Sequence, residues 1–162
     1  MPPPPAKKPL EKSLRQRALE LLSKREYSAA ELAQKLKAYA DEADDIPALI
    51  ADFQARGWLS DARYTEQMVH ARQAKFGAAR VANELREKGV DDALIAEAVA
   101  GLQENEVARA REVWRKKFKA AATTREEWAK QARFLQSRGF TFQVIKHILN
   151  RHAEDDSPED YS

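Results

Sequence analysis

Residues 59–99 decide the fold, and they read LSDARYTEQMVHARQAKFGAARVANELREKGVDDALIAEAV. Apolar residues recur at helical spacing in three segments of this stretch, which Gly77 and Gly89 separate. Glycine at the second break is typical of a left-handed residue just after a helix, where a Cβ would be penalised. Beyond this glycine, Asp91 stands where a helix N-cap is expected. The stretch therefore predicts one short three-helix unit.

The same pattern returns later in the chain, and a looser version precedes it. A shift of fifty residues places Leu85 on Leu135 and Gly89 on Gly139, whereas the first unit has Ala40 where the glycine is expected. This register indicates internal repetition. We expect a flexible Pro/Lys tail over residues 1–12, three-helix repeats over 13–58, 59–103 and 104–150, and an acidic tail over 151–162.

These units predict an all-α protein without strands. A three-helix unit this short buries little apolar surface, so the units should pack on their neighbours in an elongated tandem array with disordered termini. One compact helical bundle is the alternative. Capping boxes at Ser28–Glu31 and Thr124–Glu127 are expected to open two of the helices. Four glycines are assigned structural roles at helix ends: Gly57, Gly77, Gly89 and Gly139.

Composition excludes several functional classes. The 162 residues contain no cysteine, so the chain offers neither a disulfide nor a thiolate ligand. His70, His147 and His152 lack metal-ligand spacing, and no glycine-rich phosphate loop appears. No apolar run approaches the length of a membrane span. We predict a cytoplasmic, monomeric protein that is not an enzyme and needs no metal, cofactor or membrane.

Charge is distributed unevenly along the chain. Residues 104–150 carry eleven Lys and Arg against five Asp and Glu, a net +6, although the whole chain is only +2. Such an excess suggests a polyanionic partner, either a nucleic-acid backbone or an acidic protein face. For any single residue, an ordinary solvated helix surface is an equally good interpretation. The candidate binding residues, three of them from the central unit, are Arg72, Lys75, Arg80, Arg109, Arg111, Arg115, Lys116, Lys117, Lys119, Lys130, Arg133, Arg138 and Lys146.

The three tryptophans are the other candidates for nucleic-acid contact, because an indole ring can stack on a base. Trp58, Trp114 and Trp128 all fall at helical spacing within apolar stripes. Core packing is the expected role for all three.

Several stretches together resemble the RecX family, the bacterial regulators of the RecA recombinase. The resemblance runs from about Leu14 to Leu149 and has departures at Ser60-Asp61, at Ala78 and at Tyr39-Ala40. The stretches that carry it are REYSAAEL (25–32), GWLSDARY (57–64), Arg72, Lys75, Gly77, Arg80, Glu84-Leu85, Lys88-Gly89-Val90 and Arg138-Gly139-Phe140.

The resemblance implies a curved all-helical array of three-helix repeats. It implies binding to the RecA filament on DNA, with reduced ATPase and strand-exchange activities, through a steric and electrostatic mechanism. DNA, single- or double-stranded, would be a weaker partner through its backbone. Two other classes stay open: a sequence-specific DNA-binding protein with helix-turn-helix-like units, and a pure protein scaffold. The first is less favoured, because the cations are spread over several helices and not gathered on one recognition helix.

Overall fold

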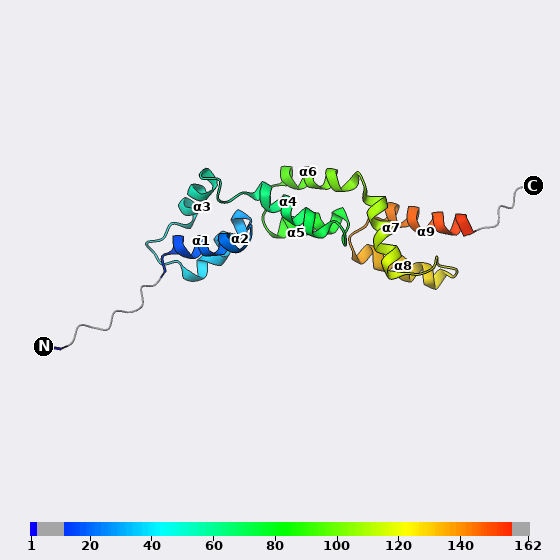
Figure 1. The fold of residues 1–162 in the computed structure, drawn as a ribbon, viewed down its shortest axis with the longest axis horizontal. Helices are drawn as coiled ribbons and strands as arrows, with labels where there is room; N and C mark the ends of the chain where they lie inside the picture. Colours follow the sequence, from blue (N-terminus) through cyan, green and yellow to red (C-terminus); the bar gives the residue numbers. More distant parts are fainter. Residues whose placement is uncertain (3–11, 157–162) are drawn as a thin grey trace, which may run out of the picture. The chain divides into compact units, whose positions relative to one another are not determined.

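The computed structural model describes residues 1–2 and 12–156, with side chains up to residue 150. All regular structure in these residues is helical, which confirms the all-α fold (Figure 1). The helices are α1 (Leu14–Lys24), α2 (Ala29–Leu36), the 3₁₀-helix η1 (Lys37–Tyr39), α3 (Ile46–Ala55), α4 (Asp61–Arg72), α5 (Ala78–Glu87), α6 (Asp92–Gln103), α7 (Glu106–Lys117), α8 (Arg125–Ser137) and α9 (Phe142–Asp156). Most of the predicted terminal tails lies outside the described residues.

Two compact units divide the described chain, one ending at Tyr64 and the other beginning at Thr65. The five-segment division, and the elongated, curved arrangement of the repeats, stay predictions. No helix in the described part of the chain is long and apolar enough to cross a membrane.

Helix starts follow the predicted capping residues in two of three places. Ser28 Oγ accepts from the Glu31 N–H, and Thr124 Oγ1 accepts from the Glu127 N–H, each at 3.1 Å. The Glu127 carboxylate accepts from the backbone and hydroxyl of Thr123, and these hydrogen bonds lower the pKa of Glu127. Asp91 occupies the N-cap position of α6, but its side chain makes no capping hydrogen bond. The predicted side-chain cap at Asp91 is therefore wrong.

Left-handed glycines end three of the helices: the sequence predicted this conformation at Gly89 and Gly139, and at Gly57 it predicted only a helix end. Gly57, Gly89 and Gly139 have φ values of 73°, 74° and 91°. The residue after each glycine donates its N–H to a carbonyl five residues earlier, as Val90 does to Leu85 at 3.1 Å, which satisfies a carbonyl at the helix end. Ala40 follows η1 with φ −82°, so this helix end, which precedes α3, is made without a left-handed residue.

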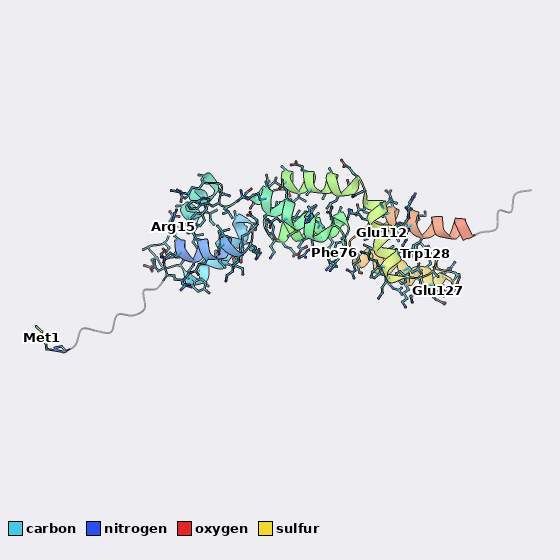
Figure 2. The ribbon with its side chains drawn as sticks, viewed as in Figure 1. Met1, Arg15, Phe76, Glu112, Glu127 and Trp128 are labelled. Atoms are coloured by element: carbon cyan, nitrogen blue, oxygen red, sulfur yellow. The ribbon has the colours of Figure 1, made fainter. Side chains whose placement is uncertain are left out.

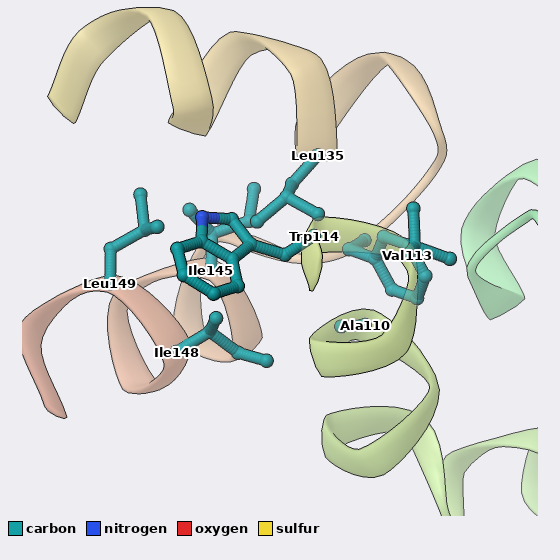
Figure 3. Close-up of a cluster of buried hydrophobic side chains, with 8 residues drawn as sticks. Ala110, Val113, Trp114, Leu135, Ile145, Ile148 and Leu149 are labelled. Carbon is teal, nitrogen blue, oxygen red and sulfur yellow. The ribbon is translucent and has the colours of Figure 1, made fainter. Parts of the chain in front are cut away.

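The first unit buries the apolar stripes of its helices in one cluster, formed by Leu14, Ala18, Tyr27, Leu32, Leu36, Phe53 and Leu59. The second unit contains a larger cluster, in which Trp114 of α7 faces Leu135 of α8 and Ile145 of α9 (Figure 3). The Trp114 indole N–H donates to Gln131 Oε1 at 2.9 Å, so its polar edge is satisfied inside the core.

An acidic residue at the start of one helix caps the start of another in both units. The Ala29 N–H, first in α2, donates to Asp61 Oδ1 at 2.8 Å, and Asp61 begins α4. The Ala78 N–H, first in α5, donates to Glu106 Oε1 at 2.7 Å, and Glu106 begins α7. Each carboxylate satisfies a free N–H and complements the positive end of a helix dipole. The same capping arrangement therefore occurs once in each unit.

Gly77 brings two turns of the second unit into direct contact. Its N–H donates to the Arg138 carbonyl at 2.7 Å, and a Cβ on it would collide with the Gly139 carbonyl. A Cβ on Gly139 would in turn collide with the backbone of Arg80. Glycine at both positions lets the start of α5 lie against the turn after α8.

Candidate polyanion-binding surface

Arg109 does not belong to a binding surface, contrary to the sequence-based assignment. Its side chain is only 10% exposed and donates to the carbonyls of Gln73, Phe76 and Leu102 at 3.0, 2.8 and 2.8 Å. Burial lowers the pKa of its guanidinium, which nevertheless stays charged. Arg109 therefore fixes the loop between α4 and α5 from inside the unit and is not part of an exposed cationic surface.

Three further arginines are exposed or half-exposed but already have partners. Arg72 makes a bidentate ion pair with Glu84 (3.0 Å), and Arg115 pairs with Glu112 (2.8 Å). Arg80 donates to the Ser137 carbonyl at 2.9 Å. A ligand that recruited Arg72 or Arg115 would have to compete with the carboxylate of Glu84 or Glu112.

Four cations lie together along one groove of about 290 Å³, which is completed by Ala74, Val113 and Phe134. They are Lys75, Lys116, Lys117 and Arg138. The groove has no acidic residue in its lining, and within residues 12–150 none of the four cations forms an ion pair. It therefore offers a concentrated positive field without an internal counter-charge, which favours an anionic ligand.

Cations and aromatic rings alternate along this side of the unit. The Arg80 guanidinium carbon lies 4.1 Å from the centre of the Phe76 ring, and that of Arg138 lies 5.5 Å from Phe76 and 5.2 Å from Phe134. Lys117 Nζ lies 5.7 Å from the centre of Phe134. Figure 2 labels Phe76, which stands in the loop before α5. Arg138, which follows α8, lies near both rings and so links the loop before α5 to α8, and Lys117 at the end of α7 extends the row beyond Phe134.

The remaining candidates do not line the groove. Arg111 is half-buried, whereas the others are exposed: Lys119, Lys130, Arg133 and Lys146. Arg72 and Arg80 line a second hollow of about 560 Å³, in which Glu84 and Glu87 make the charge mixed. The structure thus gathers four of the thirteen predicted residues around one groove and distributes the others elsewhere.

Two aromatic residues of this row were missed from the sequence, and the exposure of a tryptophan in the first unit was misjudged. Phe134 was not recognised, because phenylalanine at helical spacing normally indicates a core residue, and no pattern singled out Phe76 in the loop before α5. Trp58 was expected in the core, but its side chain is 43% exposed, with Arg15 and Arg56 at 5.7 and 5.1 Å from its ring. Trp128 is half-buried, and its indole N–H donates to Asn150 at 3.2 Å. Only Trp114 is fully in the core.

No other chemistry is evident in the described residues. Within them, no group of three His, Cys, Asp or Glu side chains is placed to hold a metal ion. The cationic groove is therefore the arrangement that any account of function has to explain.

Comparison with known proteins identifies relatives of the chain. Residues 60–99 match the family model "RecX, second three-helix domain", and residues 104–149 match "RecX, third three-helix domain". "Regulatory protein RecX" of Herminiimonas arsenicoxydans is 44% identical over 147 residues, which span 91% of this chain and 97% of that protein. "Regulatory protein RecX" of Neisseria meningitidis is 35% identical over 150 residues, or 93% and 97% of the two chains.

A solved structure shares the fold. The crystal structure of RecX from Lactobacillus salivarius superposes with a TM-score of 0.74 at 20% identity, over 87% of this chain and 95% of that one.

Proposed function

The chain belongs to the RecX family of regulatory proteins, and we propose that it binds the RecA filament on DNA and lowers its ATPase and strand-exchange activities. Its action is steric and electrostatic: it occupies the filament and performs no chemical reaction on it. The relatives are named as regulatory proteins, which agrees with a regulator and not an enzyme. Because RecA works on chromosomal DNA, we place the protein in the cytoplasm, and we take it to act as a monomer.

One observation carries the proposal: four cations that form no ion pair within residues 12–150 line a single groove, and three of them belong to the basic stretch 104–150. A RecA filament contains DNA, so it presents phosphates beside protein surfaces. Lys75 lies between α4 and α5, Lys116 and Lys117 lie at the end of α7, and Arg138 follows α8. A cationic surface drawn from three places on a rigid unit can engage phosphates while the adjoining helices contact the recombinase.

Co-sedimentation with preassembled filaments tests this function. At physiological salt the protein should pellet with RecA on single-stranded DNA, and much less with the same DNA alone. The filament offers protein and phosphate contacts together, whereas naked DNA offers only phosphates, whose contribution fades as salt is raised. In the same mixtures, strand exchange should slow. Equal pelleting with naked DNA, or discrete protected sites on duplex DNA in footprinting, would instead support a DNA-binding protein of the helix-turn-helix kind.

A further inference from the structure

We propose that the cationic groove is a binding site for single-stranded nucleic acid, in which Phe134 packs on an unstacked base while Lys75, Lys116 and Lys117 contact the flanking phosphates. This deepens the proposed function and rests on it for its setting, because it names the filament component that the groove meets. The groove is lined by Ala74, Lys75, Val113, Lys116, Lys117, Phe134 and Arg138.

The charges of the groove favour phosphate. All four ionisable groups in its lining are cations, whereas the neighbouring hollow with Arg72 and Arg80 also contains Glu84 and Glu87. Lys75, Lys116 and Lys117 are exposed, so a ligand gains their charge without first breaking an ion pair within the described chain. Positive grooves that follow a backbone are one half of the arrangement that binds single strands.

The other half is an aromatic platform, which Phe134 supplies. Its ring meets that of Phe118 edge-on, with centroids 5.4 Å apart and an interplanar angle of 86°, so its orientation is fixed by packing. Lys117 and Arg138 lie close to the same ring, which is where a base could take the place of a cation. An acidic protein face would use the cations but has no use for the ring.

The aromatic contribution also selects single strands over duplexes. In a duplex the bases are stacked and paired, and the protein meets mainly phosphates and groove edges. In a single strand the bases are free to leave the stack and pack on an aromatic or guanidinium plane. A groove of about 290 Å³ with a ring in its lining suits a short segment of such a strand.

The protein holds the groove in shape before a ligand arrives. Arg109 binds the carbonyls of Gln73 and Phe76, the residues on either side of the Ala74-Lys75 segment. The Gly77 N–H bonds the carbonyl of Arg138, which ties the other end of this loop to the turn after α8. The loop that carries Lys75 and the turn that carries Arg138 are therefore fixed in advance, and a ligand does not have to order them on binding.

The test is fluorescence anisotropy of a labelled oligo(dT) strand with the full chain, without recombinase. The double variant Lys116→Glu/Lys117→Glu should bind about ten-fold or more weakly, and its log–log salt slope should be smaller by about 1.4. The matched control is Lys130→Glu/Lys146→Glu, which makes the same charge change on exposed residues outside the groove. The affinity of the control for oligo(dT) should fall about three-fold or less, because its substitutions change only the long-range electrostatic field of the protein.

Phe134→Leu separates stacking from charge. It should weaken oligo(dT) binding about ten-fold with an unchanged salt slope, while binding of a hairpin duplex stays the same. Thermal melting followed by circular dichroism verifies that each variant is folded. If Phe134→Leu does not fold, the comparison of the two charge-reversal doubles tests the binding site by itself. The assignment would be overturned if the groove double and the control double lost the same affinity for oligo(dT). It would also be overturned if Phe134→Leu weakened duplex binding as much as oligo(dT) binding. If the groove double binds oligo(dT) normally but no longer pellets with filaments, the groove meets an acidic protein face and the proposed function stands.

Discussion

Replacing Gly139 with alanine is expected to lower the free energy of unfolding of the second unit by about 2 to 5 kcal/mol. Two costs combine at this residue. Its φ of 91° is disfavoured for any residue with a Cβ, and the Cβ itself would collide with the backbone of Arg80. Neither turn can move without breaking the 2.7 Å hydrogen bond from Gly77 to the Arg138 carbonyl. Chemical denaturation followed by circular dichroism measures the loss.

Two other glycines serve as controls, because each carries one of the two costs. Gly57→Ala has the left-handed φ of 73° but open space around the new Cβ, so about 1 to 2 kcal/mol is expected. Gly77→Ala has an ordinary φ of −81° but collides with the Gly139 carbonyl, so about 1 to 3 kcal/mol is expected. If Gly139→Ala lowers the free energy of unfolding no more than Gly57→Ala does, the two turns do not lie in close contact.

Replacing Arg109 with methionine is expected to cost about 3 kcal/mol or more, although the substitution is hydrophobic and similar in length. The guanidinium satisfies three backbone carbonyls from two segments, and methionine can satisfy none of them. It would also leave Glu106, 4.0 Å away, without its nearby positive charge. Thermal and chemical unfolding measure the stability, and hydrogen exchange should show the 73–77 loop opening first.

Arg115→Met is the matched control on the same helix. Arg115 pairs with Glu112 at the surface, where its side chain is 61% exposed, so a change of at most about 1 kcal/mol is expected. Arg109→Lys should fall between the two, because an ammonium keeps the charge but cannot span the same carbonyls. Equal stability of the methionine variants at residues 109 and 115 would contradict the internal role of Arg109.

The fold could be predicted from sequence because its determinants are local. Helical periodicity, the Ser28 and Thr124 caps and the left-handed glycines at 57, 89 and 139 each act within a few residues, and all are present in the structure. The prediction failed at Asp91, since a suitable residue at an N-cap position need not turn its side chain toward the helix.

The groove could be predicted only in part. Net charge identified the basic region, but the sequence could not separate Arg109 from its neighbours, because its partners Gln73 and Phe76 lie more than thirty residues away along the chain. The contribution of Lys75 to a groove with Lys116 and Arg138 depends on tertiary packing for the same reason. Exposure of Trp58 likewise depends on how the first unit packs, which helical spacing does not specify.

The ATPase rate of RecA assembled on single-stranded DNA, measured against rising concentrations of this protein, tests directly whether the chain inhibits the filament through its cationic groove. We predict that the rate falls with the wild-type chain and with the Lys130→Glu/Lys146→Glu control, and falls much less with Lys116→Glu/Lys117→Glu. An unchanged rate with the wild-type chain, on the RecA of its own host and on others, would show that this protein does not inhibit the filament.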